Sequence, residues 1–167
     1  DPEQIKRSIC RLVSGQEPKE AAQILLEYAG QSIEVKDIHT AKLFLDEAKT
    51  QTLKTEDAPL LAARIDSYQG WIALKNQQLS QARRYLLSAL LVNPEDPFTN
   101  YLAGYLHQQQ GQLIRAWARY LKAALVQNPF DDAIPALKKL QEQEGFKQDF
   151  NIEDACDFLD GHIYADN

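Results

Sequence analysis

The sequence lacks most features that identify enzymes and membrane proteins. It has no methionine, and only seven of its 167 residues are glycine. No apolar run approaches the ~20 residues that a membrane-spanning helix needs, so we expect no membrane insertion. It contains no HExxH, no GxSxG and no glycine-rich phosphate loop, and its three histidines are isolated. We therefore expect no catalysis by this chain alone, no cofactor and no metal ion.

Cysteine is also scarce, and this bears on the compartment. Cys10 and Cys156 lie far apart and form no cluster with metal-ligand spacing. We expect both to be buried thiols that pack as small apolar side chains, while one long-range disulfide remains open. The absent initiator methionine indicates a processed chain or a piece of a longer one. The compartment therefore stays unassigned: we favour the cytoplasm, and a processed or exported chain is compatible.

The formal net charge of −6 is unevenly distributed. Residues 146–167 contain one lysine and six acidic residues, whereas residues 63–130 contain seven basic and three acidic residues. This basic excess is too weak for a nucleic-acid-binding protein, which usually has a strongly basic face. We therefore expect a protein partner and no nucleic acid.

Helix signals dominate the chain, and no alternating run rich in Val, Ile and Thr predicts a strand. Asp with a following Pro marks several helix starts, because Asp can cap a helix and Pro fits its first turn. Nine helices are expected, at residues 2–13, 18–30, 37–51, 59–75, 79–92, 97–109, 113–126, 133–144 and 152–160.

A repeat of about 34 residues organises the middle of the chain. Gly70 and Gly104 are 34 residues apart, and Asn93-Pro94 and Asn128-Pro129 are 35 apart. The stretches RYLLSALLVNP and RYLKAALVQNP also align at 35, which indicates one residue inserted between Leu113 and Arg119. Because Pro cannot continue a helix, each Asn-Pro is expected to end a helix pair, with a following Asp capping the next pair.

The residues at fixed places in residues 63–96 and 97–130 resemble the tetratricopeptide repeat family, whose units are 34-residue helix pairs. The matching small residues and prolines are Gly70, Ala82, Ala89 and Pro94, then Gly104, Gly111, Ala116, Ala123 and Pro129. Leu86 and Tyr120 are expected to fill the space beside them. Asp66 and Asn100 stand where the family has an aromatic residue, and Gln69 replaces its Leu. Residues 39–50 resemble the second helix of an earlier, degenerate repeat, and residues 132–145 resemble the first helix of a later, incomplete one.

The resemblance implies an all-α, right-handed solenoid of about nine helices. Residues 1–145 would form the repeat domain, and residues 146–167 an acidic C-terminal capping helix or tail. An alternative for this tail is an acidic amphipathic segment that binds a partner or the basic middle of the chain.

The resemblance also implies a concave groove lined by the first helix of each pair. The residues that correspond to the family's ligand-facing positions are Arg64, Ser67, Trp71, Leu74 and Lys75, then Phe98, Tyr101, Tyr105, Gln108 and Gln109, with Tyr68 beside them. Aromatic side chains offer large contact areas with a polar tip, which suits a peptide or helix with apolar anchors. The alternative is that these aromatics are core residues. The Lys and Asn heads of the family's carboxylate clamp are absent, so a chaperone-tail clamp is not expected.

Other polar positions receive structural interpretations. His107 stands where the family has a packing aromatic and is expected to be structural. The second-helix residues Arg83, Arg84, Arg115, Arg119 and Lys122 are expected on a solvated convex face, with a docking site for an acidic partner as the alternative.

Taken together, these features predict a noncatalytic scaffold or adaptor that binds a partner segment in an aromatic groove. Trp71, Tyr101 and Tyr105 would bury the apolar side chains of the partner, and Lys75, Gln108 and Gln109 would fix its backbone or charge. Two alternatives remain: the substrate-recruiting arm of a larger enzyme, and an export chaperone for hydrophobic client proteins. Self-association through the groove is also open.

Overall fold

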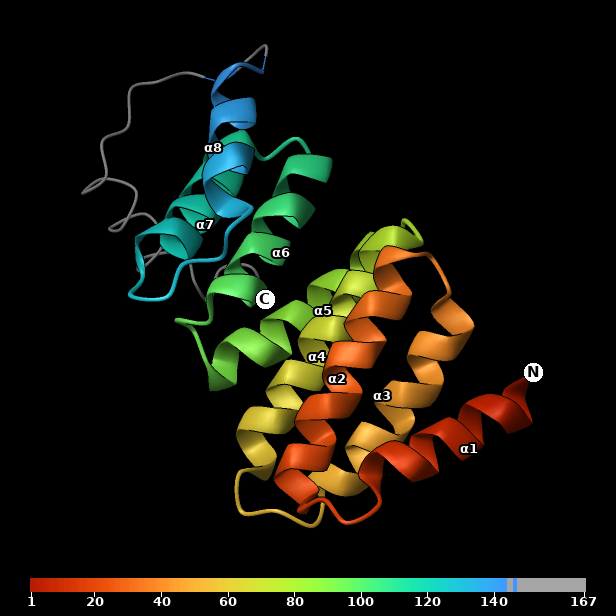
Figure 1. Cartoon of the computed structure of the whole chain (residues 1–167). Helices are drawn as coiled ribbons and strands as arrows, with labels where there is room; N and C mark the ends of the chain where they lie inside the picture. Colours follow the sequence, from red (N-terminus) through yellow and green to blue (C-terminus); the bar gives the residue numbers. More distant parts are fainter. Residues whose placement is uncertain (144–145, 147–167) are drawn as a thin grey trace.

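The computed structural model describes residues 1–143 and 146, and this part of the chain is all-helical (Figure 1). Its eight helices are α1 (Pro2–Val13), α2 (Pro18–Glu34), α3 (Ile38–Thr52), α4 (Ala58–Lys75), α5 (Leu79–Val92), α6 (Pro97–Gln109), α7 (Leu113–Leu125) and α8 (Ala133–Gln141). The all-α prediction is confirmed for these residues. The predicted helix at residues 152–160, and with it the predicted capping segment, falls outside the described residues apart from Phe146.

The helix starts follow from Asp and Pro residues. The carboxylate of Asp1 accepts a hydrogen bond from the Glu3 amide at 3.0 Å, and Asp96 caps α6 through the Thr99 amide at 2.9 Å. Asn93 ends α5, as the Asn-Pro pattern predicts. The second Asn-Pro behaves differently, because α7 has already ended at Leu125.

The predicted stop of α2 at Gly30 is wrong, since the helix continues to Glu34. Gly30 serves a packing purpose instead. A Cβ atom at this position would lie 3.2 Å from the ring of Tyr68, so the missing side chain makes room for a ring from α4.

The helices pack mainly as three hairpins, α2 with α3, α4 with α5, and α6 with α7. In Figure 1, α1 lies beside α2 and α3 at one end, and α8 lies against α7 at the other. Contacts between successive hairpins are sparser than contacts within them. Each hairpin is therefore one structural unit.

All three hairpins use the same turn. A residue with positive φ follows the first helix in each: Lys36 at 63°, Gln77 at 58° and Gly111 at 73°. The next amide then bonds the carbonyl five residues back, as in Gln78 N to Ala73 O at 2.8 Å and Gln112 N to His107 O at 2.9 Å. In the first hairpin, the Asp37 amide bonds the Ser32 carbonyl in the same way, at 2.8 Å. Only Gly111 was recognisable from sequence, because Lys and Gln rarely adopt positive φ.

Counting from the turn residue reveals a common core. Five and twelve residues on, every hairpin has a buried Ala, and nine residues on it has a large side chain that fills the space between them. These positions are Ala41, Leu45 and Ala48 in the first hairpin, Ala82, Leu86 and Ala89 in the second, and Ala116, Tyr120 and Ala123 in the third. Residues 18–52 thus form a third hairpin built like the two that the sequence reveals.

Close packing within the hairpins depends on two glycines. A Cβ atom at Gly70 would lie 2.8 Å from the Leu86 side chain, and one at Gly104 would lie 2.6 Å from the Tyr120 ring. The expectation that Leu86 and Tyr120 fill the space beside these glycines is confirmed. The first hairpin has Ala29 at the equivalent place, fully buried.

The inserted residue predicted between Leu113 and Arg119 is absent from that place. The buried positions keep a spacing of 34 from Ala82 and Ala116 through Ala89 and Ala123. The extra residue falls later, where α7 ends and Val126 leaves the helix in an extended conformation. The matching RYL triplets are therefore not structurally equivalent.

Two further observations complete the fold. Cys10 is exposed on α1, so the predicted burial of this thiol is wrong; α1 lies at the end of the array and buries only Ile9. Cys156 lies outside the described residues. Among the described helices, none is both long enough and apolar enough to cross a bilayer.

Candidate partner-binding groove

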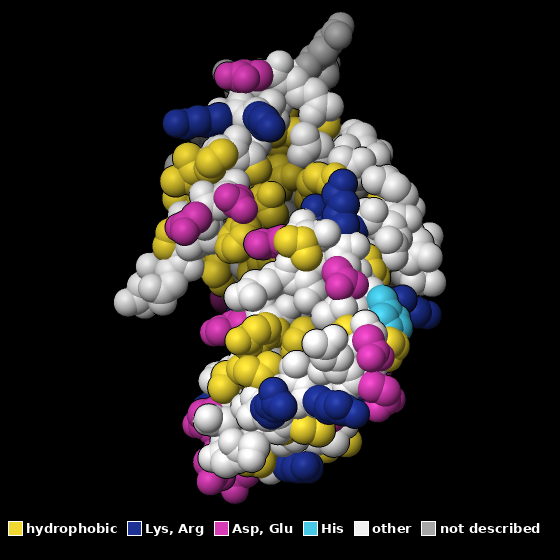
Figure 2. Space-filling model, turned by 45° about the vertical axis from the view of Figure 1, so that its right-hand side comes forward, with side chains coloured by type: hydrophobic (Ala, Val, Ile, Leu, Met, Phe, Trp, Pro, Cys, Tyr) yellow, Lys and Arg dark blue, Asp and Glu magenta, His cyan; other side chains and the backbone are white. Residues whose placement is uncertain are grey.

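A groove of about 860 Å³ runs between α2, α4, the start of α6 and the loop that joins α7 to α8. Its floor and walls include Gly30 from α2, Tyr68 and Trp71 from α4, Phe98 from α6 and Phe130 from the loop. Figure 2 shows hydrophobic side chains gathered in a hollow at the level of α6 to α8, with acidic side chains at its margin. The groove thus draws on all three hairpins.

The aromatic side chains at the groove form one continuous run. The ring centroids of Tyr68 and Trp71 are 6.0 Å apart, and those of Phe98 lie 5.5 Å from Tyr68 and 5.6 Å from Trp71. Phe130 continues the run at 5.3 Å from Phe98 and 4.7 Å from Tyr101. The rings are inclined to one another, as aromatic pairs prefer. Because each of the five side chains is only partly buried, part of this apolar surface stays open to solvent.

Phe130 was missed by the sequence reasoning, which treated Asn128-Pro129 only as a helix stop. The available signal was the dipeptide Pro97-Phe98, echoed by Pro129-Phe130. The Phe130 amide donates to the Ala123 carbonyl at 3.2 Å, which holds the loop on the end of α7 and directs the ring toward α6.

The wall contributed by α2 was missed as well. Gly30 stands six residues before its turn residue, where Trp71 and Tyr105 stand in the other hairpins. Without the common turn, α2 could not be aligned with α4 and α6. Because Gly30 was also predicted to end α2, its correspondence with Trp71 and Tyr105 could not be recognised from the sequence.

Four of the predicted binding residues line the groove, namely Arg64, Tyr68, Trp71 and Phe98. Tyr101 joins them through Phe130, and Tyr105 is half-buried further along α6. Two others lie in the interior: Ser67 is fully buried and Leu74 is 3% exposed. Lys75 and Gln109 are exposed but are not part of the groove lining.

Gln108 is engaged within the protein. Its Oε1 atom accepts a hydrogen bond from the Tyr120 hydroxyl at 2.8 Å, and its Nε2 atom donates to Gln143 at 3.2 Å. Burial raises the pKa of Tyr120 above the usual tyrosine value. The bonded phenol and amide fix the end of α6 against α7.

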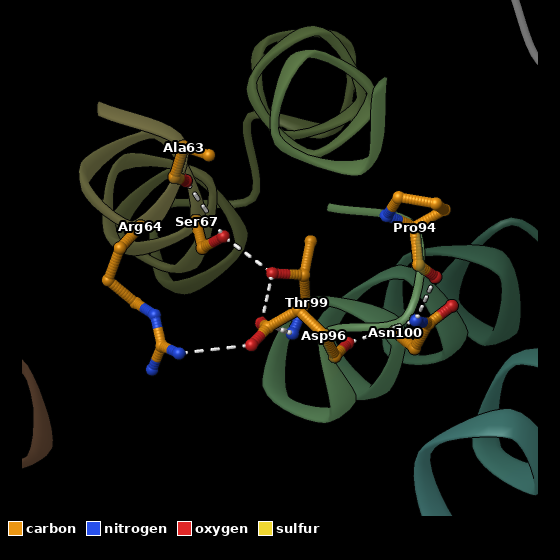
Figure 3. A network of polar contacts seen from close by, with 7 residues as sticks. All are labelled: Ala63, Arg64, Ser67, Pro94, Asp96, Thr99 and Asn100. Carbon is orange, nitrogen blue, oxygen red and sulfur yellow. Dashed lines mark hydrogen bonds and ion pairs between the residues drawn. The ribbon is translucent and has the colours of Figure 1, made fainter. Parts of the chain in front are cut away.

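A polar network that includes the groove residues Arg64 and Asp96 joins α4 to the start of α6 (Figure 3). Arg64 Nη2 lies 3.0 Å from Asp96 Oδ1, and Thr99 Oγ1 donates to the other carboxylate oxygen. Ser67 Oγ lies 2.6 Å from Thr99 Oγ1 and 3.2 Å from the Ala63 carbonyl. Since the Thr99 hydroxyl proton is committed to Asp96, the Ser67 hydroxyl donates in the short contact. The network therefore ties two hairpins together through buried groups.

Asn100 extends this network. Its Nδ2 atom donates to the carbonyls of Pro94 and Asp96, both at 2.9 Å. Its Oδ1 atom accepts from Arg119 Nη1 at 3.2 Å. A fully buried amide thus closes the loop between α5 and α6, and its position beside α7 fixes that loop.

The predicted solvated basic face is wrong for Arg119, which is 1% exposed. Lys122 is also largely covered, with 16% of its side chain exposed, and it pairs with Glu95 at 3.0 Å. At the observed spacing of 34 residues, Arg119 corresponds to Tyr85 and not to the exposed Arg84. The guanidinium of Arg84 stacks over Tyr85, 5.5 Å from the ring centroid.

His107 is buried, in keeping with its structural interpretation. Its Nδ1 atom lies 2.7 Å from Gln112 Oε1 at the start of α7, across the shared turn. No group of three or more His, Cys, Asp or Glu side chains in residues 1–143 is arranged to hold a metal ion.

In comparisons with known proteins, the chain matches no family model, no curated protein and no solved structure.

Proposed function

We propose that this chain is a noncatalytic interaction scaffold of the tetratricopeptide type, a right-handed solenoid of helix pairs whose groove holds a segment of a partner protein. The repeated architecture supports the proposal. Three hairpins share one turn and one set of buried Ala positions, and stacked units of this kind present an extended concave surface. Gly70 and Gly104 match the family pattern in position and in packing role.

The observation that carries the proposal is the run of partly covered rings at the groove. Trp71, Tyr68 and Phe98 lie within 6.0 Å of one another by ring centroid, and all three line a hollow of about 860 Å³. Aromatic side chains dominate the energetics of protein interfaces because they bury much apolar surface and lose little rotamer entropy. A peptide or helix with apolar anchors fits such a surface.

Photo-crosslinking in the source cells tests this function. A photoreactive amino acid at Gln31, an exposed groove position on α2, is expected to capture discrete protein adducts. The matched control is the same amino acid at Gln4, exposed on α1 and outside the groove. Adding Trp71→Ala to the Gln31 variant should abolish the adducts, while circular dichroism confirms the helical fold. Adducts that form equally at Gln4, or that survive Trp71→Ala, would contradict the proposal.

A further inference from the structure

The charges along the groove are mostly acidic. Four carboxylates and one guanidinium line it, from Glu27, Glu34, Glu95, Asp96 and Arg64. Arg64 is paired with Asp96, and Glu95 is paired with a lysine of α7, both at 3.0 Å. The side chains of Glu27 and Glu34 make no hydrogen bond or ion pair with any described residue. The groove therefore keeps two carboxylates available to a ligand.

Both available carboxylates stand on one wall. Glu27 and Glu34 are seven residues apart on α2, so they lie on the same face of the helix and about 10 Å apart along its axis. Gln31 lies between them on that face and also lines the groove, where its amide can bond a peptide backbone. The wall thus presents acid, amide and acid in a row.

The two carboxylates also act on the groove floor. Burial raises the pKa of the Tyr68 phenol, the neighbouring Arg64 lowers it, and the fields of Glu27, Asp96 and Glu34 raise it further. Tyr68 itself rests on Gly30, between the two glutamates along α2. The negative potential of the wall therefore extends over the aromatic floor.

Aromatic faces add to the same preference. The faces of Trp and Tyr rings carry partial negative charge and attract Lys and Arg side chains within about 6 Å. A floor of such rings beside two carboxylates attracts cations and repels anions. The acidic residues 146–167 of this chain have the wrong sign to occupy it.

We propose that the partner segment held in this groove is basic, with two Arg or Lys side chains about 10 Å apart that pair with Glu27 and Glu34, and an apolar side chain that packs on Trp71 and Phe98. This inference rests on the proposed function and gives the chemistry of the partner. The volume of about 860 Å³ suits a short segment.

A displayed library of random peptides about 16 residues long, which allows about four helical turns, tests the inference when it is selected on the wild-type chain. Enriched peptides are then synthesised, and their affinities are measured for three variants. Glu27→Gln/Glu34→Gln removes the two groove charges. Glu56→Gln/Glu142→Gln removes two exposed charges outside the groove and is the matched control. Trp71→Ala reports on the groove itself.

We expect enrichment of peptides with paired basic residues. Their affinity should fall about tenfold in Glu27→Gln/Glu34→Gln, since exposed ion pairs each contribute modestly, and less than twofold in the control. Binding should also weaken as ionic strength rises from about 0.05 M to about 0.5 M. Trp71-dependent peptides that are neutral or acidic, or that bind Glu27→Gln/Glu34→Gln equally well, would overturn the inference and leave the proposed function intact. Failure to select any Trp71-dependent peptide would overturn both.

Discussion

At the scale of single residues, the contact between Gly104 and Tyr120 leaves no room for a methyl group. The Tyr120 ring is buried and its hydroxyl is bonded to Gln108, so it cannot turn aside easily. Leu86, which faces Gly70, is a more flexible aliphatic side chain. Tyr68, which faces Gly30, is partly exposed and can tilt. The three glycines therefore differ in how much their neighbours can yield.

We predict that the cost of a Gly→Ala substitution follows this order. Gly104→Ala should lower the free energy of unfolding by about 1–2 kcal/mol, because overpacking outweighs the gain in helix propensity of about 1 kcal/mol. Gly70→Ala should cost less, and Gly30→Ala should be close to neutral. Urea denaturation of the three variants measures the order. A Gly30→Ala variant less stable than Gly104→Ala would contradict it.

One buried and two partly buried phenols should make the stability of the protein depend on alkaline pH. Burial raises the pKa values of Tyr68, Tyr101 and Tyr120 above the usual value of about 10. The unfolded chain therefore loses its phenol protons first as the pH rises, and stability falls above about pH 10. Thermal unfolding between about pH 8 and pH 11 should show this fall, and Tyr120→Phe should flatten it. Parallel pH profiles for the wild type and Tyr120→Phe would contradict this assignment.

At the scale of helices, the two RYL triplets, at residues 84–86 and 119–121, show that identical sequences can occupy different structural positions. Arg119 is buried and donates to Asn100, whereas Arg84 is exposed beside Tyr85. Arg119→Ala should lower the free energy of unfolding by about 2–4 kcal/mol. The substitution leaves the buried Asn100 Oδ1 atom without this hydrogen-bond donor and creates a cavity where the arginine side chain was packed. Arg84→Ala should cost less than about 1 kcal/mol. Denaturation of both variants compares them directly, and equal losses would mean that the triplets are equivalent after all.

The shared turn yields a prediction of stabilisation. Lys36 and Gln77 adopt the left-handed conformation that Gly111 adopts without steric strain. Lys36→Gly and Gln77→Gly should each raise the free energy of unfolding by up to about 1 kcal/mol, since the relief of strain exceeds the added entropy of the unfolded chain. The matched control is Lys49→Gly, within α3, which should lower the free energy of unfolding by about 1 kcal/mol. Losses at all three positions would contradict the argument.

These turns also explain what could and could not be predicted from the sequence. Helix starts with Asp and Pro were predictable because both residues act locally, as at Asp1 and Asp96. The first hairpin was only partly recognised from the sequence. A lysine such as Lys36 does not predict a positive φ, and Gly30 predicts a helix end although α2 continues past it. In the site, Trp71 and Phe98 followed from repeat positions. Phe130 was signalled only by the repeated Pro-Phe dipeptide, and the wall of α2 depends on tertiary packing between hairpins, which no local pattern encodes.

At the scale of the whole molecule, stability should decrease from the centre toward the ends. The outer helices bury little: α1 has one buried residue, and α8 has two. By contrast, α2, α4 and α6 bury seven or eight residues each. Contacts between hairpins are also sparser than contacts within them, as in arrays whose units interact only with their neighbours.

Hydrogen exchange is expected to follow this gradient. Amides of α1 and α8 should exchange fastest, and those of α4 and α5 slowest, because the central hairpin is covered on both sides. Mass spectrometry of exchanged peptides resolves the helices separately. Uniform protection from α1 to α8 would indicate a single cooperative unit instead.

The shared turn has a consequence for how such a protein can acquire new partners. Six residues before it, the three hairpins carry Gly30, Trp71 and Tyr105, whereas the buried Ala positions after it do not vary. The positions at or near the proposed ligand surface and the positions that hold the hairpins together thus occupy separate places relative to the shared turn. Mutation can revise the first set while the second preserves the fold, so this frame can be retargeted to a new ligand one position at a time.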